Sequence, residues 1–268
     1  MKKDVRVLIV QGYGINCETE TAWAFKKAGA DNVDKVHVNR IIENRSELDR
    51  YKIIVFPGGF SFGDHISSGK VLAMKVKTGM SSELARFINE GRLVMGICNG
   101  FQALVKMGIL PGSEDKVYPK QSVTLKWNDS ARYEDRWVSV KANPQNKSPF
   151  LNDIDTMRIP VRHGEGKFFS YAKRLREIKR KNQIAFQYIG ETGEPTMEYP
   201  CNPNGSELSI AAITNSSGNV LGMMPHPEAF ISSTHEPRWT EKSGNNMNEE
   251  GAGLKLFVNA VKYAADML

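Results

Sequence analysis

The stretch RLVMGICNGFQALVKMGIL, residues 92–110, decides the fold. Leu93 to Met95 is a short apolar run, which predicts a buried strand. A turn from Gly96 to Gly100 follows it, and an amphipathic helical pattern then continues to Gly108, a residue that favours helix termination. A strand, a tight turn and a helix in this order indicate one unit of an α/β fold.

Cys98 lies between two glycines in the pattern G-x-C-x-G. This spacing is typical of a nucleophile elbow, a strained turn that tolerates only small residues two positions to either side. A helix N-terminus favours the thiolate form of a cysteine, and the backbone N–H of Asn99 would face a developing oxyanion. Because a free cysteine is often only a buried apolar residue, the motif needs partners elsewhere in the chain.

Catalytic partners are found in MPHPE, residues 224–228, directly after the strand-like run Asn219 to Met223. Open α/β sheets place their sites at the carboxyl ends of strands. The two prolines predict an extended segment, so His226 and Glu228 would point to the same side. His226 would serve as the base for Cys98, and Glu228 would orient the imidazole.

A second glycine-rich turn, Pro57-Gly58-Gly59, follows the apolar strand predicted over 52–56. Such a turn offers free backbone N–H groups, so Gly59 is a candidate second donor to an oxyanion. A thiol, an imidazole, a carboxylate and two oxyanion donors are the parts needed for acyl transfer through a thioester.

The order of the segments predicts an α/β protein with two kinds of strand. Up to residue 110 strands alternate with helices, which predicts a parallel, doubly wound sheet. Strands are expected over 5–10, 36–38, 52–56 and 93–95, and helices over 16–29 with Asn16 as N-cap, 69–77, 81–90 and 101–108. After Pro111 further strands are expected over 122–127, 136–142, 157–163, 183–188, 207–214 and 219–223, and helices over 170–181 and 252–267. No linker or repeat interrupts the chain, so one domain spanning 1–268 is predicted.

Composition excludes several classes of protein. The 268 residues are 40% hydrophobic and 25% charged, as in ordinary globular proteins. No apolar run approaches the about 20 residues of a membrane span, and three irregularly spaced cysteines argue against a disulfide framework. We therefore expect a cytoplasmic protein that has no membrane segment. The net charge of +6 is spread along the chain, so no nucleic-acid partner is expected.

The sequence argues against three kinds of cofactor site, for a dinucleotide, a metal ion and ATP. In the glycine-rich turn at 11–14 the third glycine of a dinucleotide-binding motif is replaced by Cys17. His163 and Glu165 would provide only half of a metal site, so no metal is expected. No P-loop motif occurs, so ATP is not expected to bind this chain.

Four motifs resemble the class I (triad) glutamine amidotransferases and, more narrowly, the glutaminase subunits of phosphoribosylformylglycinamidine synthase, which act in purine biosynthesis. They are GICNGFQ at 96–102, PGGFSFGD at 57–64, HGEG at 163–166 and GMMPHPE at 222–228. Residues 16–17, 128–130 and 134–137 also resemble that subfamily. The resemblance extends from about Val5 to the last predicted helix.

The resemblance implies a flavodoxin-like, doubly wound, mainly parallel sheet with additional antiparallel strands. It implies that Cys98 attacks the side-chain amide of glutamine and that His226 and Glu228 complete the triad. The implied oxyanion donors are Gly59 and Asn99, and the implied glutamine-binding residues are Gly58, Gln102, His163, Gly164 and Glu165. Ammonia would pass to a separate synthetase subunit that binds ATP and Mg²⁺, and the need for a small third subunit stays open.

The chain departs from the family pattern at Ala229, where many members have Arg after H-P-E, and in two longer segments, 191–205 and 232–251. Candidate docking residues, chosen by residue type, are Arg132, Arg136, Arg238 and Trp239. Two alternatives remain. One is a stand-alone cysteine hydrolase or peptidase of the class I amidotransferase type, and the other is a flavodoxin-like binding protein in which Cys98 is structural.

Overall fold

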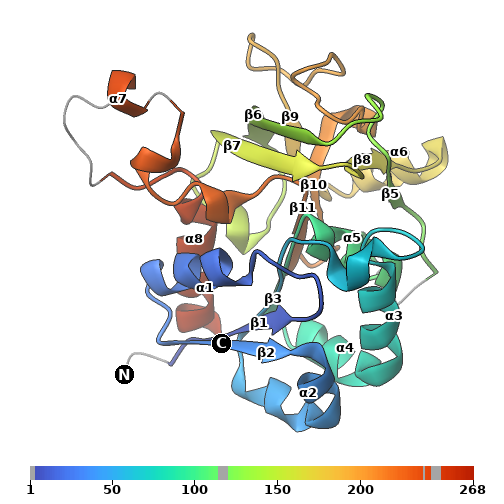
Figure 1. Ribbon diagram of the computed structural model, residues 1–268, viewed down its shortest axis with the longest axis vertical. Helices are drawn as coiled ribbons and strands as arrows, with labels where there is room; N and C mark the ends of the chain where they lie inside the picture. The colour runs from blue at the N-terminus through green and yellow to red at the C-terminus, as the bar shows by residue number, and fades with distance from the viewer. Residues whose placement is uncertain (1–3, 114–119, 238, 243–248) are drawn as a thin grey trace.

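A nine-stranded sheet runs through the molecule and is parallel on one side and antiparallel on the other (Figure 1). The computed structural model describes residues 4–113, 120–237, 239–242 and 249–268. The strand order is β2-β1-β3-β4-β11-β10-β9-β6-β7. The parallel strands are β1 (Arg6–Gln11), β2 (Asn32–His37), β3 (Ile53–Phe56), β4 (Leu93–Ile97) and β11 (Val220–Met223). The antiparallel strands are β6 (Glu134–Ala142), β7 (Thr156–His163), β9 (Ile184–Tyr188) and β10 (Ile210–Thr214).

Helices cover both faces of the parallel half. Every residue of β3, β4 and β11 is buried, as expected for parallel strands whose two faces are both covered. On one side lie α1 (Glu18–Lys27) and α8 (Leu254–Met267), and on the other α3 (Lys70–Gly79), α4 (Ser81–Asn89) and α5 (Asn99–Met107) (Figure 1). The predicted doubly wound sheet with additional antiparallel strands is confirmed.

The remaining elements are short. A two-stranded antiparallel sheet joins β5 (Thr124–Lys126) to β8 (Lys167–Phe169), and β8 was not predicted. The other α-helices are α2 (Val38–Glu43), α6 (Ala172–Arg180) and α7 (Trp239–Lys242). The 3₁₀ turns are η1 (Arg45–Arg50), η2 (Ser61–Asp64), η3 (Pro149–Leu151), η4 (Glu207–Ser209), η5 (Pro227–Ala229) and η6 (Ser233–His235). No helix within the described ranges combines the length and the apolar character needed to cross a membrane.

Two predicted element ends differ from those in the structure. The strand predicted over 36–38 ends at His37, because the Nδ1 atom of His37 accepts a hydrogen bond from the N–H of Asn39 at 3.2 Å and starts α2. Asn16 does not cap α1. Cys17 occupies the N-cap position and makes no side-chain capping hydrogen bond there.

The segment predicted as one strand over 207–214 divides into a 3₁₀ turn and β10. Leu208 and Ser209 have positive φ angles of 53° and 57°, which an extended strand cannot include. β10 pairs with β11 in antiparallel fashion, and Thr214 of β10 lies opposite Leu221 of β11.

The sheet order brings four loops to one edge. Because β1, β3, β4 and β11 are parallel neighbours, their carboxyl ends point the same way. The segments that follow these strands contain Cys17, Gly59, Cys98 and His226. Chemistry-bearing residues from distant parts of the sequence are therefore collected at this edge.

Candidate active site

Cys98 lies in a strained turn between β4 and α5. Its φ and ψ angles are 50° and −105°, which few non-glycine residues adopt. A Cβ atom on Gly96 would come within 2.5 Å of Leu104, and one on Gly100 would collide with the carbonyl oxygen of Phe56. The predicted elbow geometry, including the need for both glycines, is therefore confirmed.

The surrounding strands hold the Cys98 backbone and thiol in place. The Cys98 N–H donates to the carbonyl of Met223 in β11 at 2.7 Å, which joins the elbow to the segment that carries His226. The Sγ atom lies 3.5 Å from the carbonyl oxygen of Arg162 in β7. The side chain is 6% exposed, so a reagent reaches it only through the cavity described below.

His226 and Glu228 form a buried pair. Nδ1 of His226 lies 2.6 Å from Oε1 of Glu228, and both residues are almost fully buried. The segment is not extended as predicted. It forms the 3₁₀ turn η5, in which the Ala229 N–H donates to the His226 carbonyl at 3.2 Å. The side chains of His226 and Glu228 therefore meet across a turn. They point to the same side, as expected, but a 3₁₀ turn and not an extended segment brings them together.

The charges around His226 favour its protonated form. Burial by itself would lower the pKa of the imidazole, but the Glu228 carboxylate and the Cys98 thiolate outweigh it and hold this pKa well above its usual value of 6.5. The Nε2 atom of His226 is buried without a hydrogen-bond partner among the described residues. A proton on this atom is thus available to a molecule that enters the site.

A cavity of about 210 Å³ joins the predicted nucleophile and base. Its lining comes from the four loops named above and from β6–β7. The lining residues are Asn16, Cys17, Glu20, Gly59, Phe60, Cys98, Tyr133, Arg162 and His226. The volume suits a small, compact substrate, and burial of Cys98 and His226 limits the access of water.

Gly59 presents its backbone to this cavity. Its φ of +141° and the crowded backbone of residues 14–16 around its Cα exclude any side chain. The N–H groups of Asn16 and Cys17 donate to the Gly58 carbonyl, and the Phe60 N–H donates to the Gly14 carbonyl. Within the described part of the chain these bonds leave the Gly59 N–H without an acceptor.

Asn99 connects the elbow to the PGGFSFGD loop. Its side-chain Oδ1 accepts a hydrogen bond from the Ser61 N–H at 3.1 Å, and its Nδ2 donates to Asp64 at 2.8 Å and to Gln102 at 3.1 Å. Asp64 also accepts from the N–H of Gly69. The Asn99 side chain thereby joins the elbow to the loop that contains Gly59. These bonds fix the two predicted oxyanion donors, Gly59 and Asn99, relative to each other.

Gln102 contacts the HGEG segment instead of the cavity. Its Nε2 donates to the backbone carbonyl of Glu165 at 2.5 Å. Gly58, Gln102, His163, Gly164 and Glu165 are not among the lining residues, although a Cβ on Gly58 would lie 2.8 Å from the His226 ring. The role of these residues in glutamine binding stays a prediction.

His163 is part of a buried polar network. Asn204 Nδ2 lies 3.0 Å from His163 Nε2, and burial, together with the nearby His226 charge, lowers the pKa of His163 to about 3. The imidazole is therefore neutral, with Nε2 as acceptor and the proton on Nδ1. Gly166 packs against the ring so closely that a Cβ would collide with it, which explains the glycine three residues after His163.

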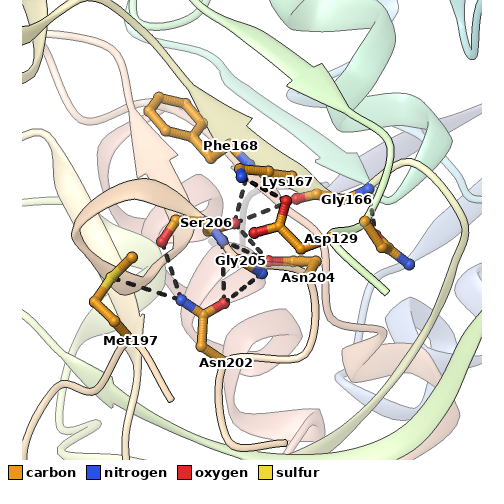
Figure 2. A network of polar contacts seen from close by, with 10 residues as sticks. Asp129, Gly166, Lys167, Phe168, Met197, Asn202, Asn204, Gly205 and Ser206 are labelled. Carbon is orange, nitrogen blue, oxygen red and sulfur yellow. Dashed lines mark hydrogen bonds and ion pairs between the residues drawn. The ribbon is translucent and has the colours of Figure 1, made fainter. Parts of the chain in front are cut away.

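Figure 2 shows the network beyond Asn204. The Ser206 hydroxyl lies 2.7 Å from Asn204 Oδ1 and accepts a hydrogen bond from the Phe168 N–H at 2.9 Å. Asn202 accepts hydrogen bonds from the N–H groups of Gly205 and Ser206 at 3.1 Å. The network belongs to the longer segment 191–205 and its flanks, so this segment supports the strand that carries Arg162 and His163.

Sequence reasoning missed several cavity residues. Cys17, Glu20, Tyr133 and Arg162 were not assigned to the site, although Asn16-Cys17 was noted as a family resemblance. One signal was present for Cys17. It follows β1 just as Gly59 follows β3, so both residues lie at the same edge of the parallel sheet. Tyr133 and Arg162 carried no such signal. Arg162 lies in the antiparallel strand β7 and Tyr133 directly precedes the antiparallel strand β6, and the sequence does not reveal where these strands lie in the sheet.

The candidate docking residues have mixed outcomes. Arg136 is engaged within the chain, with an ion pair to Glu134 at 2.6 Å and a hydrogen bond to the Tyr199 hydroxyl at 2.6 Å. Arg238 lies outside the described residues. A docking role for the others stays a prediction.

Comparison with known proteins agrees with this geometry. Residues 4–264 match the family model of the CobB/CobQ-like glutamine amidotransferase domain. A protein named phosphoribosylformylglycinamidine synthase subunit PurQ from Methanococcus maripaludis is 42% identical over 268 residues, covering 96% of this chain and 97% of the relative. A protein of the same name from Dehalococcoides mccartyi is 41% identical, covering 97% and 98%.

Solved structures give the same picture. A chain in the structure of PurLQS from Thermotoga maritima matches with a TM-score of 0.71 and 28% identity, and the match covers 98% of this chain and 99% of that one. The chain belongs to the CobB/CobQ-like glutamine amidotransferase family.

Proposed function

We propose that this chain is the glutamine-hydrolysing subunit of a phosphoribosylformylglycinamidine synthase. The observation that carries the proposal is that Cys98 and His226 line one cavity, with Glu228 joined to His226 at 2.6 Å behind it. Family membership and the names of the relatives support the choice of reaction and pathway. The chain spans nearly the whole length of those relatives.

The proposed reaction begins with attack of the Cys98 thiolate on the carbon of the glutamine side-chain amide. The C–S bond forms, and the carbonyl oxygen takes the negative charge. The backbone N–H groups of Gly59 and Asn99 stabilise this oxyanion. His226 then gives its Nε2 proton to the departing nitrogen, and ammonia leaves a glutamyl thioester on Cys98.

Hydrolysis of the thioester uses the same groups. Neutral His226 removes a proton from a water molecule, which attacks the thioester carbonyl, and the C–S bond breaks to release glutamate and the thiolate. The raised pKa of His226 suits the first step, because a protonated imidazole is ready beside the leaving group. Glu228 orients the imidazole and stabilises the imidazolium.

Two charged residues at the cavity suit the zwitterionic end of glutamine. Arg162 and Glu20 both line the cavity, and within the described residues neither forms an ion pair. We assign Arg162 to the α-carboxylate of glutamine and Glu20 to its α-ammonium group, because an arginine fork binds carboxylates in two-point contact. This assignment would make the site select free glutamine over a glutamine residue within a peptide.

The proposal places the use of ammonia on a partner. A synthetase subunit would bind ATP and Mg²⁺, activate the amide oxygen of formylglycinamide ribonucleotide and receive the ammonia released here. The similarity to a chain of PurLQS supports a multi-subunit assembly, and a small third subunit fits the same likeness. A cytoplasmic location is part of the proposal, and the three free cysteines support a reducing compartment.

Glutamate release tests the proposal. Wild type and Cys98→Ser are assayed alone and with the cognate synthetase, ATP and formylglycinamide ribonucleotide. We expect release only from wild type with the loaded partner, since coupling between the two sites would leave the free subunit almost idle. Equal release by the free wild type would favour a stand-alone hydrolase, and unchanged release by Cys98→Ser would refute the assignment of the nucleophile.

A further inference from the structure

The cavity beside Cys98 has a buried inner end and an exposed rim. Cys17, Cys98 and His226 line its inner end, and all three side chains are buried. The lining residues that are exposed at the surface are Asn16, Phe60, Tyr133 and Arg162. A molecule that reaches the Cys98 thiol from solvent therefore has to pass these exposed side chains, and two of them are large aromatic rings.

Phe60 and Tyr133 pack against each other at this rim. Their ring centroids lie 6.4 Å apart and their planes are inclined by 33°. This separation falls within the about 4.5–7 Å that is typical of interacting aromatic pairs. Phe60 is 47% exposed and Tyr133 is 52% exposed, so each ring has one part in solvent and one part against the cavity. The pair thus forms one apolar edge of the entrance, and this edge widens only if the rings part.

The backbone under the two rings is fixed, whereas the rings themselves are held by packing. The Phe60 N–H donates to the Gly14 carbonyl at 2.7 Å. The residue before Tyr133 is tied by its carbonyl, which accepts a hydrogen bond from Asn128 Nδ2 at 2.8 Å. The Tyr133 hydroxyl has no hydrogen-bond partner among the described residues. Side-chain rotation can therefore open the entrance without any movement of the sheet.

We propose that the rings of Phe60 and Tyr133 determine which amides reach Cys98. The pair admits glutamine and excludes γ-glutamyl compounds that carry a bulky group on the amide nitrogen. This inference rests on the glutaminase function proposed above. The cavity volume of about 210 Å³ agrees with it, because sites for drug-sized ligands measure about 300–1,000 Å³.

The proposed reaction directs the amide nitrogen toward these rings. His226 protonates that nitrogen, and ammonia has to leave while the glutamyl group is still bound to Cys98. Because both of these residues are buried at the inner end, the way out leads to the rim. Arg162 at the rim is assigned to the α-carboxylate, so the departing nitrogen passes Phe60 and Tyr133. A bulky substituent on the nitrogen would collide with the closed pair.

Alkylation of Cys98 in the purified full chain tests the gate without an assay of glutamine hydrolysis. Iodoacetamide and its fluorescein-labelled derivative share one reactive group and differ in size. Peptide mapping gives the rate ratio of the bulky to the small reagent at Cys98. Tyr133→Ala should raise this ratio about two- to tenfold, the rate equivalent of the energy of an aromatic pair.

Two variants control this measurement. Tyr133→Phe keeps the ring and should retain the wild-type ratio. Tyr171→Ala should retain it too, since Tyr171 is an exposed tyrosine outside the lining of this cavity. Equal ratios in wild type and Tyr133→Ala would overturn the proposal. A Tyr133→Phe variant that behaves like Tyr133→Ala would also overturn it, because the hydroxyl and not the ring would then control entry.

Hydrolysis of γ-glutamyl-p-nitroanilide by the complete complex gives the second readout. The kcat/KM for this compound, relative to that for glutamine, should rise in Tyr133→Ala by a similar factor, and an unchanged value would overturn the proposal. If Tyr133→Ala fails to fold, Phe60→Ala should raise the alkylation ratio in the same way, and no change there would overturn it as well. A raised alkylation ratio in a chain that never hydrolyses glutamine would refute the proposed function and leave the size selection at Cys98 standing.

Discussion

Replacing Glu228 with Gln should lower glutaminase activity about 1000-fold at neutral pH. The change keeps the shape of the side chain and removes its charge. In the structure the side chains of His226 and Glu228 are 3% and 0% exposed, and Nδ1 of His226 lies 2.6 Å from Oε1 of Glu228. At an effective dielectric constant of about 20, two unit charges about 4 Å apart attract by about 4 kcal/mol. Because about 1.4 kcal/mol corresponds to a tenfold change in rate, loss of this attraction from the imidazolium gives about three decades.

The pH profile separates this explanation from a structural one. The Glu228 carboxylate holds the pKa of His226 up against burial, which acts to lower it. In Glu228→Gln the alkaline limb of glutamate release should therefore move to lower pH, because the imidazolium that protonates ammonia is lost earlier. The assay is kcat/KM for glutamine with the complete complex across the pH range. A loss below about tenfold with an unmoved alkaline limb would refute the reasoning.

Glu134→Gln is the matched control. Glu134 is also a buried carboxylate in an ion pair, with Arg136 at 2.6 Å, and it lies outside the cavity lining. Its substitution should lower the free energy of unfolding and leave the alkaline limb in place. The comparison therefore distinguishes loss of a buried charge in general from loss of the charge that acts on His226.

Three further outcomes are expected. Arg162→Met should raise KM for glutamine about 10- to 100-fold with a smaller effect on kcat, whereas Arg158→Met on the same strand, outside the cavity lining, should leave KM unchanged; equal effects would contradict the assignment. Gly100→Ala should lower the free energy of unfolding by about 3–5 kcal/mol in denaturant titration, since its Cβ has no space. Asn204→Leu should lower the free energy of unfolding by about 1–3 kcal/mol in the same measurement, because His163 loses its buried partner; stability equal to wild type would show that the network does not stabilise the fold.

The parallel half of the fold was predictable because its signals are local. β1 is apolar from Val7 to Val10, β3 and β4 contain no polar side chain, and each is followed by a glycine-rich turn or a helical pattern. The elbow needed only five residues, Gly96 to Gly100, because the steric demand for glycine arises from contacts within β4, α5 and the adjacent strand. The short strand β8 was missed, since three residues carry too little periodicity to stand out.

The candidate site was only partly predictable because half of its lining depends on long-range placement. The sequence indicated Cys98, His226 and Glu228, because the position of each follows from a short local motif. The Nε2 of Gln102 shows the limit for contacts: it donates to the Glu165 carbonyl, 63 positions away in the sequence. Only the antiparallel half of the sheet brings that carbonyl close, and no local pattern specifies it.

The site contains two buried cysteines, and the surroundings of Cys17 disfavour its thiolate form. Both occupy N-cap positions, Cys17 before α1 and Cys98 before α5. The first turn of α1 contains the acidic residues Glu18 and Glu20, whereas the first turn of α5 has none. Burial is the main cause that raises the pKa of Cys17; the charges of Glu228 and Glu20 add to it, and His226 acts against it without reversing it. Cys17 therefore stays a thiol.

This difference makes alkylation selective. Limited treatment with iodoacetamide near neutral pH, followed by peptide mapping, should modify Cys98 before Cys17. Glu20→Gln should speed modification of Cys17 about two- to fivefold. This factor corresponds to the about 0.3–1 kcal/mol that a charge near a helix N-terminus contributes. Faster modification of Cys17 than of Cys98 in the wild type would mean that the first-turn charges do not select the nucleophile, and that the thiol beside α1 must be considered for the attack on glutamine.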